Sequence, residues 1–205
     1  AEVLIVESTY GKPAYRFPPQ REMEAEIVDW LRDTGDRPVL LFGYVLGRAQ
    51  ELELLAERAN RDRIFVTEAI ADLDGVIEAG TGIEFDSALY DDAVELQAGD
   101  ALVLPGQTNS LRFVERLREE RGAIAAGFSG WASDSSYRFA RDLDVAFPLS
   151  DHPDFDELLE IVRAVDPDVV YTVHGFVDEL ASAIQSRLGI RAQALKSNQR
   201  SLGEF

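Results

Sequence analysis

Short apolar runs alternate along the chain with longer segments whose apolar residues recur every three or four positions. Short runs rich in β-branched residues indicate buried strands, and the 3.6-residue period is typical of amphipathic helices. We expect strands at residues 2–7, 38–42, 64–66, 101–104, 123–128, 145–147, 169–173 and 191–195. We expect helices at 20–32, 48–60, 69–78, 109–120, 153–165 and 177–188. This alternation predicts an α/β protein with a mostly parallel sheet flanked by helices.

Two segments show no clear period. Residues 79–99 are glycine-rich and then acidic, and residues 129–141 are polar with Gly and Ser. The helix expected at 109–120 has Thr108 or Asn109 as its N-terminal cap, because their side chains can accept a backbone hydrogen bond there. The chain also begins in mid-strand at Ala1. We therefore expect a piece of a larger protein or a processed chain.

The composition is that of a globular protein: 205 residues, of which 46% are hydrophobic. This length suits one large domain or two small ones. No run approaches the roughly 18 apolar residues of a membrane span, and no signal peptide is visible. The chain has no Cys, which is typical of intracellular proteins. We expect a cytoplasmic protein without membrane contact.

The charge is strongly negative, with 38 acidic and 20 basic residues and a net charge of −18. Of the basic residues only Lys12 and Lys196 are lysines, and the rest are arginines. An acidic, lysine-poor surface suits a high-salt cytoplasm, where salt screens the self-repulsion. We expect a halophilic protein. Its net charge then says little about its partners, and a local positive site can persist inside an acidic surface.

The two histidines are the scarcest chemical groups. His174 comes just after the expected strand 169–173, and His152 lies at a turn between a strand and a helix. Sites in α/β sheets are built at the carboxyl ends of strands. Either histidine alone suits a structural role, but two at this kind of position favour function. Glu7 also ends a strand, where its carboxylate could orient an imidazole and keep it protonated as a general acid, or only cap a turn.

Two further strand ends carry small polar turns. Residues 42–48 read Phe-Gly-Tyr-Val-Leu-Gly-Arg, so Gly43 and Gly47 could present backbone N–H groups to an anion, with Arg48 in support, or simply form a tight connection. This is neither a phosphate loop of the G-x-x-x-x-G-K-[ST] type nor a G-x-G-x-x-G turn, so a plain nucleotide-binding module is a weak alternative. After strand 123–128, Ser129 is followed by Trp131, which could stack on a base or fill the core. Arg138 and Arg141 could contact phosphates or pair with surface carboxylates.

Taken together, five segments resemble the β-CASP nucleases of the metallo-β-lactamase superfamily. They are Glu7–Gly11, Phe42–Gln50, Ser129–Trp131, Ser150–Phe155 and Val173–Gly175, in this order. The family includes RNA 3′-end processing endonucleases, RNase J, Artemis-type DNA nucleases and ligase-associated DNA exonucleases. The resemblance implies that residues 1–10 are a strand of the lactamase core, 11–147 a β-CASP domain, and 148–205 the C-terminal part of that core.

The resemblance also implies roles. Glu7 would be the acid of motif A and His152 the general acid of motif B that protonates the leaving oxygen. His174 at motif C would ligate one zinc ion, and it favours the RNA-processing branch over the Artemis branch. Gly43, Gly47, Arg48 and Ser129 would bind phosphates. RNA is thus favoured over DNA as the substrate, with a ligase-associated DNA exonuclease as an alternative.

The family's H-x-H-x-D-H motif, a further His and an Asp are missing from this sequence. With two His and no Cys, the chain cannot bind the two zinc ions of the complete enzyme alone. We expect the other ligands from a missing N-terminal half or a partner chain, and a homodimer is one way to supply them. A second hypothesis is a catalytically inactive scaffold or partner subunit.

Overall fold

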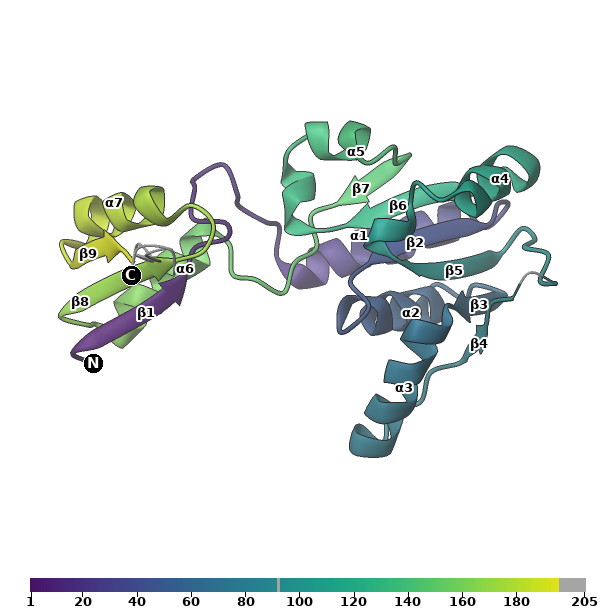
Figure 1. Ribbon diagram of the computed structural model, residues 1–205, viewed down its shortest axis with the longest axis horizontal. Helices are drawn as coiled ribbons and strands as arrows, with labels where there is room; N and C mark the ends of the chain where they lie inside the picture. Colours follow the sequence, from purple (N-terminus) through teal and green to yellow (C-terminus); the bar gives the residue numbers. More distant parts are fainter. Residues whose placement is uncertain (92, 196–205) are drawn as a thin grey trace, which may run out of the picture. The chain divides into compact units, whose positions relative to one another are not determined.

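The computed structural model describes residues 1–91 and 93–195 (Figure 1). The chain divides into two compact units: unit 1 comprises Ala1–Arg16 and the residues from Asp151 onward, and unit 2 comprises Phe17–Ser150. The boundaries between the two units thus fall after Arg16 and after Ser150. The domain boundaries expected from the sequence fall after residues 10 and 147. Residues 196–205, which complete the last expected segment and include Lys196, lie outside the described residues.

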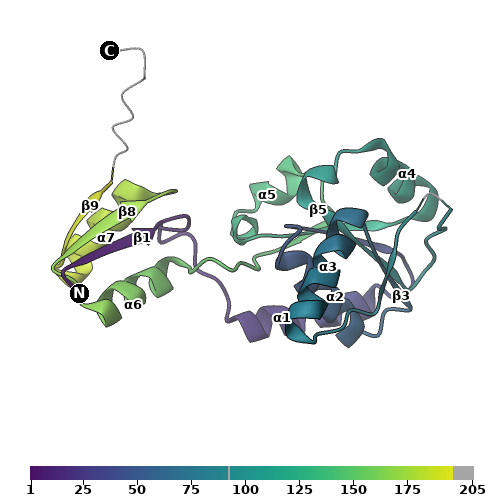
Figure 2. The same cartoon turned by 60° about the horizontal axis from the view of Figure 1, so that its bottom comes forward.

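Unit 1 is a three-stranded parallel sheet in the order β1-β8-β9 with two helices, as Figures 1 and 2 show. Its elements are β1 (Val3–Glu7), α6 (Phe155–Val165), β8 (Val169–Val173), α7 (Val177–Leu188) and β9 (Arg191–Ala194). The apolar residues of both helices pack in one core with Val6, Val170 and Ala192 of the three strands. Because side chains alternate along a strand, Val3 and Ile5 point to the other face, where they are 52% and 60% exposed.

Unit 2 is a six-stranded sheet in the order β4-β3-β5-β2-β6-β7, in which every pairing is parallel. Its strands are β2 (Val39–Gly43), β3 (Arg63–Val66), β4 (Ser87–Leu89), β5 (Asp100–Pro105), β6 (Ile124–Phe128) and β7 (Val145–Phe147). Its helices are α1 (Gln20–Asp33), α2 (Arg48–Arg58), α3 (Glu68–Thr81), η1 (Gly106–Thr108), α4 (Arg112–Arg121), η2 (Gly130–Ser133) and α5 (Ser136–Ala140).

Helices cover both faces of this sheet, and each face has its own apolar core. On one face α1, α2 and the first turn of α3 pack against Val39, Leu41 and Val103. On the other face α4 packs against Leu40, Leu102 and neighbouring apolar residues. The central strands are therefore buried on both sides, which explains their almost uninterrupted apolar sequences. The α/β fold with parallel strands that the sequence predicted is confirmed.

The helix expected from residue 109 begins at Arg112 instead. The hydroxyl of Thr108 donates to the Pro105 carbonyl, and the amide of Asn109 donates to the Arg141 carbonyl. Both side chains are thus used by other partners, and neither caps the helix. The two segments without a clear period also contain short elements, β4 in the first and η2 and α5 in the second. None of the described helices has the length and apolar character that a membrane crossing requires.

A buried carboxyl group lies between α2 and α3. Glu53 has no exposed surface, and a hydrogen bond from the Ser87 side chain, which lowers its pKa, only partly offsets the effect of burial. Burial raises the pKa of Glu53 to about 8, and the nearby carboxylates of Asp74, Glu57 and Glu78 also raise it. The pKa of Asp74 is raised as well, mainly by burial, although the Gln50 amide donates to it at 2.7 Å. Between about pH 4.5 and pH 8, Glu53 therefore carries a proton in the folded chain that it loses in the unfolded chain.

This proton makes the stability of unit 2 depend on pH. Because the pKa of Glu53 in the folded chain lies above its ordinary value of 4.5, the free energy of unfolding falls as pH rises from about 4.5 to about 8, with a slope approaching 1.4 kcal/mol per pH unit. We expect Glu53→Gln to flatten this dependence and to stabilise unit 2 at pH 8. Urea unfolding can be followed by tryptophan fluorescence, since Trp30 and Trp131 both lie in unit 2. Glu26→Gln changes an exposed residue on α1 and should leave the dependence on pH unchanged. If Glu53→Gln shows the same slope as the unsubstituted chain, this account is wrong.

Candidate active site and a separate pocket

Glu7 and His174 lie at the carboxyl ends of two paired strands in unit 1. In the parallel register of β1 and β8, Glu7 is opposite Val173, and His174 follows directly. His174 is exposed and has a φ of +57°, an uncommon conformation for a non-glycine residue. Backbone strain of this kind persists where the surrounding structure holds it in place. The sheet therefore presents the two side chains at one edge, as the pattern of the sequence indicated.

Ser8 holds the two strand ends together, a role that the sequence analysis missed. It is fully buried, and its hydroxyl donates to the backbone carbonyls of Val173 and His174. Its backbone N–H also donates to the Val173 carbonyl at 2.8 Å, and its own carbonyl accepts from Phe176 at 2.7 Å. Gly175 passes so close that a Cβ there would lie 2.4 Å from the Ser8 carbonyl oxygen. No local sequence signal separates this serine from an ordinary loop residue.

His152 contacts Glu7. The Nδ1 atom of His152 lies 3.5 Å from Oε1 of Glu7, and the other carboxylate oxygen accepts the Thr9 N–H at 2.6 Å. The buried Tyr10 ring packs edge-on to the imidazole with 6.1 Å between ring centres. The loop that carries His152 leads into α6, whose N-terminus is fixed by reciprocal hydrogen bonds between Asp154 and Glu157 at 2.9 Å. The imidazole is thus positioned from two sides.

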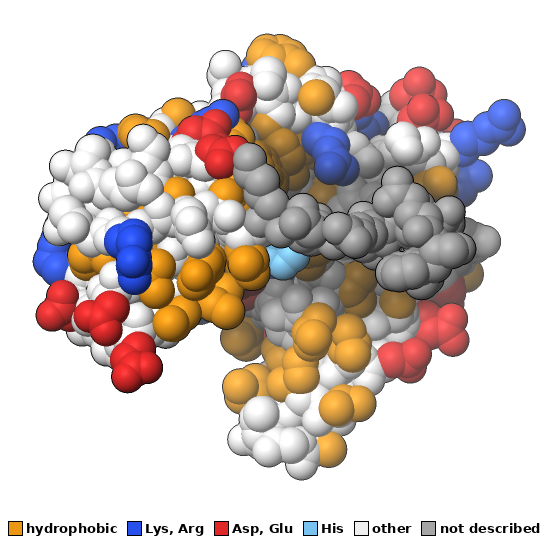
Figure 3. Space-filling model, turned by 60° about the vertical axis from the view of Figure 1, so that its left-hand side comes forward, with side chains coloured by type: hydrophobic (Ala, Val, Ile, Leu, Met, Phe, Trp, Pro, Cys, Tyr) orange, Lys and Arg blue, Asp and Glu red, His pale blue; other side chains and the backbone are white. Residues whose placement is uncertain are grey.

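This arrangement suits proton transfer. The side chain of Glu7 is 26% exposed and that of His152 is 56% exposed. With Nδ1 turned to the carboxylate, Nε2 is the nitrogen that can face a substrate. A histidine held by an acidic group in this way can serve as a general acid or base. Figure 3 shows one face of the molecule, on which a histidine side chain reaches the surface.

The donors present do not by themselves fit a zinc centre. A zinc site needs at least three protein ligands, usually His, Cys or a carboxylate. In residues 1–91 and 93–195 no three such side chains converge into a group that could hold a metal ion. His174 and His152 are the only imidazoles in the chain. We therefore derive no catalytic step through a metal from this chain.

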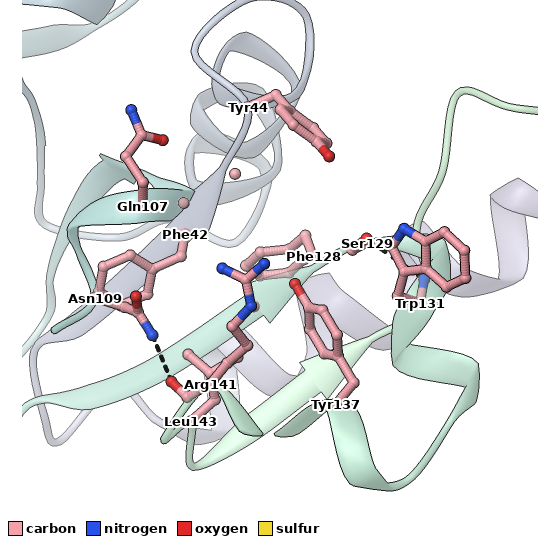
Figure 4. A pocket seen from close by; sticks show the side chains of 13 residues that line it. Phe42, Tyr44, Gln107, Asn109, Phe128, Ser129, Trp131, Tyr137, Arg141 and Leu143 are labelled. Carbon is pink, nitrogen blue, oxygen red and sulfur yellow. Dashed lines mark hydrogen bonds between the residues drawn. The ribbon is translucent and has the colours of Figure 1, made fainter. Parts of the chain in front are cut away.

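A separate pocket of about 280 Å³ lies within unit 2, at the carboxyl ends of β2, β5 and β6 (Figure 4). In the sheet, the strand that follows β2 in sequence, β3, lies on one side of β2, whereas β6 lies on its other side. The pocket therefore lies at the point where the strand order reverses. Ligands bind at such points in open α/β sheets. Gly43 and Ser129, two of the predicted phosphate-binding residues, line this pocket.

Gly47 and Arg48 do not line it. Gly47, with a φ of +85°, starts α2 and donates its N–H to the Gln50 side chain at 2.7 Å. Arg48 is 2% exposed, forms an ion pair with Glu51 and packs behind Gly43, where a Cβ would lie 2.6 Å from its Cγ. Arg48 therefore does not line this pocket, and its role in phosphate binding stays a prediction. The cation that lines the pocket is Arg141, which the sequence left open between phosphate binding and surface pairing.

The pocket is also free of negative charge. Its lining includes Arg141 and no Asp or Glu, in a chain whose net charge is −18. Within the described part of the chain, no hydrogen bond or ion pair engages the Arg141 guanidinium, which lies 5.8 Å from the Tyr137 ring centre. Arg138, by contrast, donates to the Asp144 carbonyl and is not part of the lining. The pocket therefore presents a local positive charge in a chain that is acidic overall.

Residues 145–195 match a family described as "Zn-dependent metallo-hydrolase RNA specificity domain". Over 84 residues the chain is 40% identical to a protein of Methanocaldococcus jannaschii named "Transcription termination factor FttA", a match that covers 40% of this chain and 13% of that protein. These matches support a member of the β-CASP group of the metallo-β-lactamase superfamily.

Two other relatives align over nearly the whole length of this chain. It is 35% identical over 206 residues to a "Probable DNA ligase" of Opitutus terrae, across 99% of this chain and 20% of that protein. It is 24% identical over 234 residues to "DNA ligase 6" of Arabidopsis thaliana, across 97% of this chain and 16% of that protein. The chain spans at most a fifth of the length of these relatives.

Proposed function

We propose that this chain forms the proton-donating part of a zinc-dependent phosphodiester hydrolase that cleaves nucleic acid. The contact between Glu7 and His152 beside His174 carries the proposal. His152 donates the proton from Nε2 to the oxygen that leaves when the P–O bond breaks, which prevents the departure of an unstable alkoxide. Glu7 acts through His152 by holding Nδ1, so it is a positioning residue.

Bound zinc would supply Lewis-acid chemistry, namely an activated water and stabilisation of charge on the phosphate. His174 is the one ligand that we assign to this chain. The remaining ligands would come from residues outside these 205 or from a partner chain. The open face of the unit 1 sheet supports the presence of such additional residues, because its apolar side chains Val3 and Ile5 are more than half exposed. We assign unit 1 to the lactamase core and unit 2 to the β-CASP domain.

We propose DNA as the substrate, as in a ligase-associated DNA exonuclease. The relatives that align with both units are named as DNA ligases, and this supports a role in DNA metabolism. RNA is the second candidate, favoured by the name of the family that matches residues 145–195 and by the match to a transcription termination factor. His174 at motif C also favours RNA by family resemblance.

Cleavage assays on matched strands test this proposal. The longest natural protein that contains this chain, loaded with zinc, is given single-stranded DNA and RNA of one sequence, each labelled at one end. We expect DNA to be cleaved faster than RNA, and His152→Ala to slow both reactions. Faster cleavage of RNA would contradict the choice of DNA and favour the second candidate. If neither strand is cleaved, the hydrolase proposal is wrong and the scaffold hypothesis gains support.

A further inference from the structure

The lining of the unit 2 pocket combines aromatic rings with a single cation. Phe42, Phe128 and Leu143 form an apolar floor, and Tyr44, Trp131 and Tyr137 stand around it. Tyr44 is 71% exposed, which is costly for a large aromatic side chain without a partner. Figure 4 shows the guanidinium of Arg141 and the hydroxyl of Tyr137 pointing to the same side, toward Phe128 and Tyr44. The pocket thus offers flat apolar surfaces next to a positive charge.

We propose that this pocket binds one nucleotide of the substrate strand, with its base stacked on Tyr44 and Tyr137 and its phosphate paired with Arg141. A nucleobase is flat and apolar on its faces, so aromatic side chains hold any base with little sequence preference. A guanidinium recognises phosphate through paired N–H donors. The volume of about 280 Å³ lies near the lower end of the range for small-ligand pockets, which suits a single nucleotide.

The absence of carboxylates strengthens this assignment. A random patch on a surface with nearly two acidic residues per basic residue would include several of them. The pocket has an unengaged guanidinium and no Asp or Glu, so it attracts anions. The acidic remainder of the surface repels them more strongly. Ser129 adds a hydroxyl whose oxygen already accepts from Trp131 at 3.4 Å and whose proton remains available to donate.

The role of the pocket in holding a strand rests on the proposed function, but nucleotide binding itself can be tested without cleavage. The 205-residue chain is titrated with dAMP by calorimetry, and in parallel by tryptophan fluorescence. Trp131 lines the pocket and Trp30 lies in the core against Phe147, so the fluorescence change should vanish in Trp131→Phe. Two further probes separate the two parts of the ligand. Adenosine lacks the phosphate, and deoxyribose 5-phosphate lacks the base.

We expect saturable binding of dAMP, and weaker binding of either probe. Arg141→Gln should weaken dAMP about tenfold or more and leave adenosine unchanged. Tyr44→Ala should weaken dAMP and adenosine about fivefold or more, and leave deoxyribose 5-phosphate unchanged. Tyr44 lies in an exposed loop, so its truncation should not unfold the chain. Arg116→Gln and Phe139→Ala are matched controls, since both side chains are exposed and lie outside the pocket.

Three results would overturn the proposal. The first is no saturable binding of dAMP up to about 10 mM. The second is equal affinity for dAMP and deoxyribose 5-phosphate, which would leave a plain phosphate site. The third is binding of dAMP that a 5′-phosphorylated tetranucleotide does not displace, which would make the ligand a free nucleotide. If dAMP binds as expected but the complete protein cleaves no strand, the pocket stands and only the hydrolase proposal falls.

Discussion

Replacement of His152 by alanine is expected to slow strand cleavage by the complete, zinc-loaded protein about 100-fold or more. The imidazole is more than half exposed, and the Glu7 carboxylate fixes its orientation from behind. Its loss removes the proton donor, and we expect the sheet edge to stay in place, because the imidazole meets the buried Tyr10 ring only edge-on. Binding of the substrate should therefore change little, and the effect should appear in kcat.

Two companion variants separate this role from a structural one. Glu7→Gln keeps a side chain of the same shape but loses the charge next to Nδ1, so we expect a smaller loss than in His152→Ala. Glu160→Ala changes an exposed residue on α6 and should cleave at the normal rate. Rates of His152→Ala within a few-fold of the unsubstituted protein would show that His152 is not the proton donor.

Gly175→Ala is expected to loosen the strand ends that carry Glu7 and His174. Gly175 has a φ of +65°, and a Cβ would lie 2.4 Å from the Ser8 carbonyl oxygen and 2.5 Å from the Thr9 Cα. Both are backbone atoms, so the loops must move apart. The left-handed conformation alone costs about 1–2 kcal/mol with a side chain, and the clash adds to it. We expect faster hydrogen exchange in β1 and β8, and slower cleavage.

Gly189→Ala is the matched control in the same unit. Gly189 has a φ of +70°, but no atom lies within 4 Å of the position of a Cβ. Alanine there suffers the same backbone strain without the clash. We expect Gly189→Ala to lower the stability of unit 1 by about 1 kcal/mol and to leave cleavage unchanged. Equal effects of the two substitutions on exchange and cleavage would rule out the contact between Gly175 and Ser8 as a support of the site.

The sequence was informative where one local rule decides the structure. Val39–Phe42 and Ala101–Leu104 are apolar runs that can only be strands buried on both faces, and they are. The position of Glu7 and His174 at one sheet edge followed from the strand ends alone.

Long-range contacts were not predictable. Ser8 looks like any loop serine, and only the return of β8 beside β1 gives its hydroxyl two carbonyl partners. Thr108 and Asn109 look like helix caps, but Pro105 and Arg141 take their side chains. Arg48 follows a glycine turn, and the space left by Gly43 draws it inward to Glu51. In each case a tertiary partner outweighs the local preference.

Leaving-group dependence tests the central claim, the role of His152 as proton donor, most directly. The zinc-loaded complete protein and its His152→Ala variant are compared on a DNA strand and on a p-nitrophenyl phosphodiester of thymidine. p-Nitrophenolate leaves as a stable anion and needs no proton, whereas the sugar alkoxide needs one. We predict a loss of about 100-fold or more on DNA and little loss on the p-nitrophenyl ester. An equal loss on both substrates would contradict the role of His152 as the general acid.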